Sequence, residues 1–191
     1  MNWYPEFNFI LASKSPRRQQ LLKSLDIDFS VKTLEVDETY PDYLSKEEVP
    51  VYLAELKAKA FLAELEEKDL LITADTIVCL RDQILGKPGN YDEAFNMLRK
   101  LSACKHEVIT GVCLTSVKKK ISFYSSTEVE FKELSDEEID YYIQNYHPFD
   151  KAGAYGIQEW IGSIGIRQIE GSFYNVMGLP IQKLYETIKK F

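Results

Sequence analysis

The stretch FNFILASKSPRRQQLLKSL, residues 7–25, holds the pattern that decides the fold class. Phe7 to Ala12 is a short apolar run of the length and composition of a buried strand. Pro16 suits a first helical position, and Ser15 suits the N-cap before it. The expected buried side of that helix consists of three leucines, Leu21, Leu22 and Leu25. The stretch therefore predicts a strand, a turn and a helix.

The same alternation continues along the chain. Apolar runs predict strands at 70–80, 106–117, 121–134 and 166–170, with a short partner strand ending near Leu85. Helices are expected at 49–66, 90–101 and 135–146, and from 178–180 to 190. The pairs Ser45 with Glu48, Asn90 with Glu93, and Ser135 with Glu138 match N-terminal capping patterns. Interleaved strands with helices on the outside predict an α/β or α+β sheet protein, which we take as mixed α/β and as a single domain over residues 1–191.

Composition narrows the class of ligand. The net charge of -7 argues against binding to nucleic acid polymers, although a few local cations could still capture a small anion. Three widely spaced cysteines without a CxxC motif indicate reduced thiols. No export signal and no membrane-spanning run is recognisable, so we expect a cytoplasmic protein that does not contact membranes.

Two charged residues interrupt apolar patterns. Asp75 lies inside the apolar run at 70–80, where a carboxylate without a partner would be very costly. We therefore expect Asp75 to face a cation, a metal or a proton that it accepts, the alternative being a helix cap or a strand end. Lys57 falls between Leu53 and Phe61 on the apolar side of its helix. It either extends past the edge of the core, which the local sequence alone favours, or points into a cleft.

Two arginines, Arg17 and Arg18, occupy the first turn of the helix that begins at Pro16. Free N–H groups and the positive end of the helix dipole make such a position suitable for anions. Arginine also binds phosphate oxygens in a bidentate way. The pair predicts an anion site, with a solvated surface pair as the alternative.

Three further positions give weaker signals. Lys87 lies in a glycine-flanked loop from which it could reach a phosphate, although a solvated lysine is commoner there. Glu38 ends an acidic cluster that could bind a divalent metal together with Asp75, or could be a solvated loop. Gln158 ends a glycine-punctuated segment, and its amide complements the N3–H and O4 edge of uracil or thymine. Turn formation alone would explain that segment equally well.

In this order the motifs closely resemble those of the Maf family of nucleotide pyrophosphatases, over nearly the whole chain. The specific stretches are LASKSPRR at 11–18, ADTIV at 74–78 and DKAGAYGIQ at 150–158. Shorter matches are Val36-Asp37-Glu38, Lys57-Ala58, Gly86-Lys87-Pro88, Thr110-Gly111-Val112 and Val176-Met177-Gly178-Leu179-Pro180. One departure follows Gln158, where Glu159-Trp160-Ile161-Gly162 replaces the small glycine-rich turn of many relatives, and it bears on base preference.

The resemblance implies a two-lobed fold like that of inosine triphosphate pyrophosphatases, with a central mixed sheet flanked by helices and the nucleotide in a cleft between the lobes. It implies hydrolysis of dTTP and UTP to the monophosphate and pyrophosphate. Asp75 is then the expected proton acceptor, and Glu38 with Asp75 the expected site of a divalent cation, Mg²⁺ or Mn²⁺. The expected phosphate-binding positions are Ser13, Arg18, Lys57 and Lys87. The expected base-selecting positions are Arg17, Thr76 and Gln158.

The resemblance also implies that the partner is a small nucleotide and that the chain forms a homodimer. Two other functions remain as alternatives. One is a nucleotide-binding regulator of cell division or septum formation, without catalysis. The other is a pyrophosphatase for modified pyrimidine nucleotides.

Overall fold

The computed structural model describes residues 6–191, which form a seven-stranded sheet with helices around it. The strands are β1 (Asn8–Ala12), β2 (Phe29–Lys32), β3 (Asp69–Leu80), β4 (Gln83–Leu85), β5 (Lys105–Thr115), β6 (Lys120–Phe131) and β7 (Ile166–Glu170). The α-helices are α1 (Pro16–Lys23), α2 (Glu48–Phe61), α3 (Tyr91–Leu101), α4 (Asp136–Tyr146), α5 (Trp160–Gly165), α6 (Phe173–Val176) and α7 (Ile181–Lys189). Short 3-10 helices occupy Leu62–Glu64, Pro148–Asp150 and Ala152–Ala154.

The sheet is mixed. Its strand order is β2-β1-β3-β5-β6-β7, with β4 paired to β3. Strand β1 is parallel to both β2 and β3, whereas β4 is antiparallel to β3 and β7 is antiparallel to β6. A parallel neighbour requires a crossover connection, and α1 and α2 supply the connections from β1 to β2 and from β2 to β3. These observations confirm the predicted mixed α/β class.

The chain divides into two compact units, and we describe each by itself. Unit 1 comprises Met1–Asp75, Thr110–Ser125 and Gly178–Phe191. Unit 2 comprises Thr76–Ile109 and Ser126–Met177. The predicted cleft between two lobes and the assignment of one domain to residues 1–191 stay predictions.

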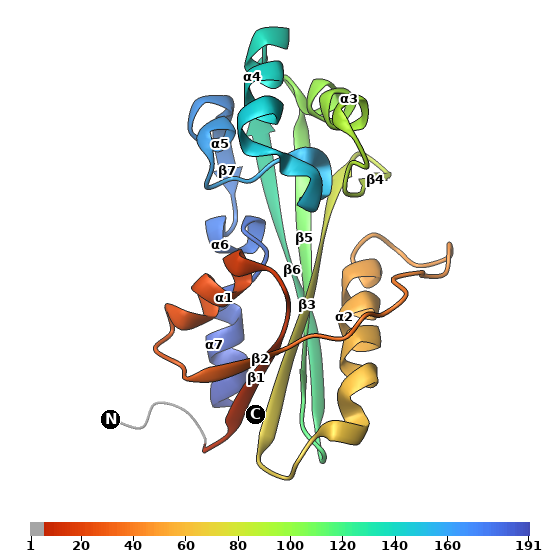
Figure 1. Ribbon diagram of the computed structural model, residues 1–191, viewed down its shortest axis with the longest axis vertical. Helices are drawn as coiled ribbons and strands as arrows, with labels where there is room; N and C mark the ends of the chain where they lie inside the picture. Colours follow the sequence, from red (N-terminus) through yellow and green to blue (C-terminus); the bar gives the residue numbers. More distant parts are fainter. Residues whose placement is uncertain (1–5) are drawn as a thin grey trace. The chain divides into compact units, whose positions relative to one another are not determined.

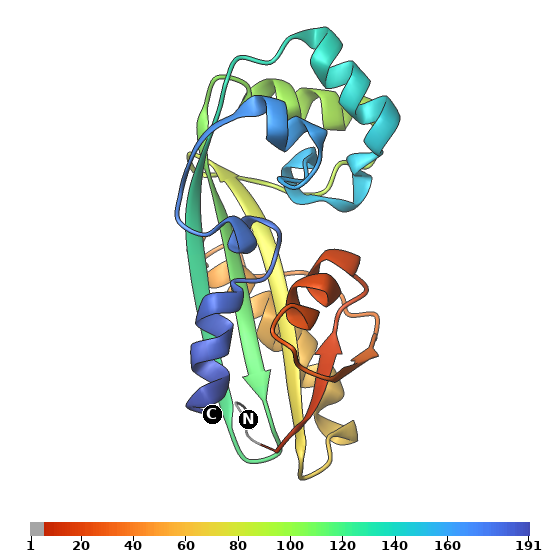
Figure 2. The same ribbon diagram turned by 90° about the vertical axis from the view of Figure 1, so that its left-hand side faces the viewer.

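Within unit 1, helices cover both faces of the strands. Figures 1 and 2 show α1 and α7 on one face and α2 on the other. The side of the sheet that faces α2 buries a cluster formed by Ile10, Ala54, Ala58, Phe61, Leu71 and Cys113. In unit 2, Figure 2 shows α3, α4 and α5 together on one face of the strands. A larger cluster lies there, and it includes Leu98, Phe131, Tyr142 and Ile161.

The helix caps predicted at Asn90 and Ser135 form as expected. The Asn90 side chain accepts from Glu93 N at 2.9 Å at the start of α3. At the start of α4, Ser135 Oγ accepts from Glu138 N at 3.2 Å, and Glu138 Oε2 accepts from Ser135 N at 3.0 Å. Because these side chains satisfy N–H groups that have no partner inside the helix, they define where each helix begins.

Three of the elements that differ from the sequence-based expectation are β2, α2 and α5. Strand β2 was not predicted, because its side chains are half-buried or exposed and give no apolar signal. Helix α2 ends at Phe61 and continues only as a 3-10 turn, so the predicted end at 66 is wrong. The segment at 160–165 forms α5 in spite of two glycines. A Cβ on Gly162 would lie 1.9 Å from the carbonyl oxygen of Ile157, so this short helix requires glycine at its close approach to the preceding loop.

His106 is a buried neutral residue in the core of unit 2. It is 2% exposed, its Nε2 lies 2.7 Å from Tyr155 Oη, and its ring centroid lies 5.3 Å from that of Phe131. Burial lowers the pKa of His106 from 6.5 to about 4, against a smaller opposing effect of Glu128. As pH falls from 6.5 toward about 4, His106 takes up a proton in the unfolded chain but stays neutral in the folded chain. The stability contributed by neutral His106 is therefore present above the unfolded pKa and is lost as pH falls toward the folded pKa.

We predict that this histidine accounts for about 2 kcal/mol of the stability lost between about pH 7.5 and about pH 5. His106→Asn should be less stable at the higher pH but should lose less on acidification than the wild type. The exposed His147 supplies the control, because His147→Asn should keep the wild-type pH dependence. Urea unfolding of the three proteins at both pH values measures the difference. Equal acid sensitivity in wild type and His106→Asn would contradict the prediction.

Candidate functional site

The first part of the site is the turn between β1 and α1. Ser15 caps α1 by accepting from Arg18 N at 3.4 Å, as the sequence predicts. Ser13 is 8% exposed, and its Oγ accepts from Ser15 N at 3.2 Å. The half-buried Arg18 is held at the start of the helix by a 2.8 Å hydrogen bond from its Nε to the carbonyl oxygen of Gly178. The turn therefore fixes both the N-terminus of α1 and the guanidinium beside it.

The second part is an ion pair between α2 and β3. Lys57 Nζ lies 2.6 Å from Asp75 Oδ1 and 3.0 Å from Glu38 Oε1. Asp75 is 8% exposed, whereas the Glu38 side chain is 45% exposed. Lys57 thus does not extend past the edge of the core, and Asp75 is neither a helix cap nor a strand end. Lys57, which interrupts the apolar side of α2, therefore pairs with Asp75, which interrupts the apolar strand β3.

Close packing of α2 on the sheet produces this ion pair. Thr73 Oγ1 donates to the carbonyl oxygen of Ala54 at 2.7 Å, which ties the helix to β3 two residues before Asp75. A Cβ on Gly111 of β5 would lie 2.3 Å from the backbone of Pro50 in α2. Real Cβ atoms do not approach backbone so closely, so glycine at 111 is what lets the helix reach the sheet. Lys57 is consequently positioned over Asp75 by backbone contacts rather than by its own flexible side chain.

The charges of unit 1 act on one another. Burial lowers the pKa of Arg18 below the ordinary value for arginine, and the positive charge of Arg17 acts in the same direction. The negative charges of Asp75 and Glu38 raise this pKa and offset part of the shift. An arginine remains charged in spite of such a shift. Arg17, Arg18 and Lys57 thus form a group with Asp75 and Glu38 in which cations outnumber carboxylates. Such a group favours an anionic ligand.

The carboxylates present a donor set that suits a hard divalent cation. Asp75 and Glu38 approach the same ammonium group, so their oxygens converge on one region. Among residues 6–191, no three His, Cys, Asp or Glu side chains gather as a complete set of metal ligands. Mg²⁺ is usually bound through one or two carboxylates together with phosphate oxygens of the substrate. The two residues therefore fit a metal that arrives with a phosphorylated substrate.

Three of the predicted site residues belong to unit 2. Thr76 is half-buried in β3, and Lys87 is exposed in the loop between β4 and α3. Gln158 is exposed just before α5, and its Nε2 donates to Glu159 Oε1 at 3.4 Å. The convergence of these three residues with those of unit 1 on one ligand stays a prediction.

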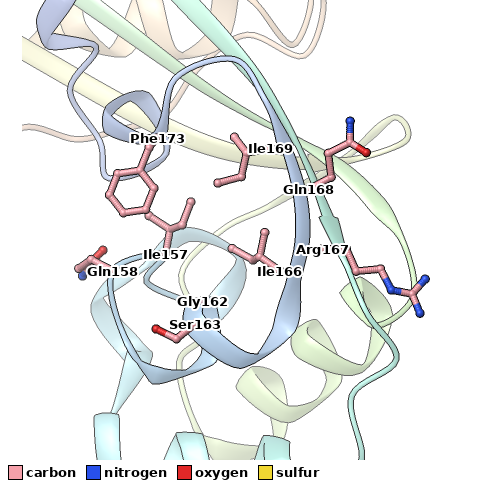
Figure 3. A pocket seen from close by; sticks show the side chains of 9 residues that line it. All are labelled: Ile157, Gln158, Gly162, Ser163, Ile166, Arg167, Gln168, Ile169 and Phe173. Carbon is pink, nitrogen blue, oxygen red and sulfur yellow. The ribbon is translucent and has the colours of Figure 1, made fainter.

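Gln158 borders a hollow of about 460 Å³ in unit 2. Its lining comprises Ile157, Gln158, Gly162, Ser163, Ile166, Arg167, Gln168, Ile169 and Phe173. Figure 3 shows the side chains of Arg167 and Gln168 pointing away from the isoleucine and phenylalanine side chains. The wall beside the Gln158 amide is therefore mainly apolar.

Sequence reasoning missed a polar network beneath Gln158. Lys151 is 7% exposed and pairs with Asp150 and Glu159. The fully buried Tyr142 donates to Glu159 Oε2. Burial, reinforced by Glu159, raises the pKa of Tyr142 above its usual range, so the phenol keeps the proton that it donates. The available signal was a lysine among small residues at 151–154, where a long charged side chain must be buried and paired.

Trp160, the bulkiest residue of the segment after Gln158, packs on a helix. Its ring centroid lies 4.8 Å from that of Tyr141 in α4, at an interplanar angle of 60°. The tryptophan thus anchors α5 to α4 inside unit 2.

None of the helices within residues 6–191 has the length and apolar character needed to traverse a bilayer.

Comparisons with known proteins identify the family. A dTTP/UTP pyrophosphatase of Phocaeicola vulgatus is 58% identical over 186 residues, which cover 97% of this chain and 96% of the relative. A protein of the same name from Parabacteroides distasonis is 52% identical over 187 residues and 97% of each chain. A solved structure of the Staphylococcus aureus Ham1 protein is similar at 16% identity, over 65% of this chain and 71% of that protein, with a TM-score of 0.47. The family model described as Maf-like protein matches residues 8–191. The chain belongs to the Maf family.

Proposed function

We propose that this protein is a nucleoside triphosphate pyrophosphatase that hydrolyses dTTP and UTP to the monophosphate and pyrophosphate. Relatives that share more than half of its residues over nearly the full length are named for that activity. The structural observation that carries the proposal is Lys57 held between Asp75 and Glu38. The names of these relatives do not favour the alternative of a regulator without catalysis.

We assign to Asp75 the role of proton acceptor. Lys57 holds this carboxylate through Oδ1, so we assign proton acceptance to Oδ2. A water oxygen attacks the α-phosphorus, its proton passes to Asp75, and the bond from the α-phosphorus to the oxygen bridging the β-phosphorus breaks. The products are the nucleoside monophosphate and pyrophosphate. General base assistance of this kind contributes to rate when the acceptor lies within hydrogen-bond reach of the water.

The cations of the site bind the triphosphate. Arg18 and Lys57, with Ser13 beside them, are assigned to phosphate oxygens, and Lys87 is assigned to the departing pyrophosphate. These groups stabilise the charge that builds on the leaving group, which is the main source of acceleration in phosphoryl transfer. A divalent cation, Mg²⁺ or Mn²⁺, would neutralise further phosphate charge when bound, and Glu38 and Asp75 are the residues that would hold it.

The base-selecting role is assigned to Arg17, Thr76 and Gln158. The Gln158 amide carries the donor and acceptor needed for the N3–H and O4 edge of uracil or thymine. Activity on modified pyrimidine nucleotides is a finer alternative within the same proposal. The cytoplasmic location, the homodimer and the exclusion of nucleic acid polymers stay predictions.

We predict that the purified protein releases pyrophosphate from dTTP and UTP in the presence of Mg²⁺ or Mn²⁺. A panel that also contains 5-methyl-UTP and 7-methyl-GTP separates canonical from modified substrates. Removal of divalent cations with a chelator should abolish turnover, because without a bound cation the carboxylates of Glu38 and Asp75 repel the triphosphate instead of holding the ion that would neutralise it. Tight nucleotide binding without pyrophosphate release under any metal would support the regulatory alternative instead.

Asp75→Asn should lower kcat by about 10²–10⁴-fold with dTTP and UTP, because the amide cannot accept the proton. The variant keeps the size of the side chain, so its far-UV circular dichroism should match that of the wild type, while its unfolding midpoint should fall because Lys57 loses a buried partner. Asp82→Asn, an exposed change in the turn between β3 and β4, is the matched control and should keep normal activity. A fully active Asp75→Asn enzyme would remove Asp75 from the reaction.

Lys57→Gln should reduce kcat/KM for dTTP by about 10²-fold, because one cation that faces the phosphates is lost. Lys59→Gln makes the same change two residues later on an exposed position of α2, and we expect it to have little effect. Steady-state kinetics of both variants against the wild type test this difference. If both substitutions reduced activity equally, helix stability rather than phosphate binding would explain the loss.

A further inference from the structure

A second buried lysine, Lys151, lies in unit 2 outside the residues assigned to the reaction. Its Nζ lies 2.7 Å from Asp150 Oδ1 and 3.2 Å from Glu159 Oε1. The lysine side chain is 8% exposed and that of Glu159 is 19% exposed. Because a buried ammonium requires acceptors, this pairing holds the Glu159 carboxylate in one place.

The other oxygen of Glu159 is fixed from the opposite direction. Tyr142 donates its hydroxyl proton to Glu159 Oε2 and accepts from Gly156 N at 3.0 Å. Gly156 contributes in addition through its missing side chain. A Cβ there would lie 2.8 Å from Glu159 Cδ and 2.9 Å from Gln158 Nε2. Glycine therefore leaves the space that the carboxylate and the neighbouring amide occupy.

The network ends at Gln158. Its Nε2 donates to Glu159 Oε1 at 3.4 Å. A carboxylate can only accept hydrogen bonds, so the amide nitrogen is turned toward Glu159 and the amide oxygen is turned away from it. The amide nitrogen carries two N–H groups, so a second donor remains for a ligand.

We propose that Glu159 is a positioning residue that holds the Gln158 amide in this orientation, and that it thereby makes the protein select uracil and thymine over cytosine. Uracil and thymine present an N3–H donor beside the O4 acceptor, and Gln158 Oε1 and its remaining N–H match that pair. Cytosine presents an acceptor at N3 beside an amino group at C4. An amide free to turn over would pair with either base, and the carboxylate prevents the turn.

The inference rests on the proposed function, because the proposed function assigns recognition of the base to Gln158. The apolar hollow that Gln158 borders supplies a surface on which a planar ring could rest in the same unit. We therefore expect the selection against cytosine to come from this segment rather than from the residues that bind phosphate.

The test compares kcat/KM for UTP and CTP, which differ only at the edge that Gln158 would contact. The wild type should prefer UTP by about tenfold or more, because a site built to pair with an N–H rejects a base that lacks it. Glu159→Gln keeps the size of the side chain and an acceptor for Tyr142 but can donate to Gln158, so the amide is no longer held. The UTP to CTP ratio should fall by about fivefold or more in this variant. A merely structural role would lower both activities and leave the ratio unchanged.

Two further variants complete the experiment. Glu133→Gln makes the same substitution at an exposed position between β6 and α4 and should keep the wild-type ratio. Gly156→Ala retains every charge of the network but crowds the amide and the carboxylate, so it should lower the ratio as Glu159→Gln does. Thermal unfolding of each variant confirms that the ratio is measured on folded protein.

The outcomes separate the two proposals. If the wild type hydrolyses none of the nucleotides, the proposed function fails. If the wild type hydrolyses CTP as efficiently as UTP, or if folded Glu159→Gln keeps the full preference for UTP, the positioning role of Glu159 is overturned while the pyrophosphatase activity stands. A lower ratio in both network variants, with an unchanged ratio in Glu133→Gln, supports the inference.

Discussion

The ion pair between Lys57 and Asp75, 2.6 Å between Nζ and Oδ1, is the interaction on which the site in unit 1 depends. Either charge alone would destabilise the contact between α2 and the sheet, because the free energy needed to remove an unpaired ion from water exceeds what the surrounding residues contribute. The pair also explains why the helix must approach so closely. Gly111 and the hydrogen bond from Thr73 to α2 bring the backbones together, and the lysine then meets the carboxylate. The carboxylate to which we assign proton acceptance is in this way kept buried and paired.

Local sequence patterns were sufficient for most of the fold and for part of the site. Caps at Ser15, Asn90 and Ser135 mark helix starts because a side-chain oxygen meets a backbone N–H three residues later, a purely local event. Lys57 and Asp75 were recognisable for a related reason, since each breaks an apolar period and must find a partner. The sequence alone could not say that the two residues are partners of each other, because that depends on the packing of α2 on β3.

Elements without a periodic signal escaped prediction. Strand β2 has no buried face, so it is specified by parallel pairing with β1 rather than by its own residues. Helix α5 contains two glycines, and its position depends on the contact between Gly162 and the loop before it. The network of Tyr142, Lys151 and Glu159 joins a helix, a residue between two 3-10 helices and the N-cap of α5, which lie apart in the chain. Each of these residues gives no signal by itself, and only the tertiary structure shows that a hydrogen bond and an ion pair link them.

The same arrangement of charges, a lysine between two carboxylates, occurs in both units. In each, a largely buried lysine lies between two carboxylates: Lys57 between Asp75 and Glu38, and Lys151 between Asp150 and Glu159. The difference lies in what else touches the carboxylates. Glu159 is fixed on its second oxygen by a buried tyrosine, whereas the Glu38 side chain is 45% exposed. Rigidity suits a group that orients an amide against a base. The more exposed pairing suits the role that we propose for Glu38, and this contrast follows from burial and hydrogen bonding alone.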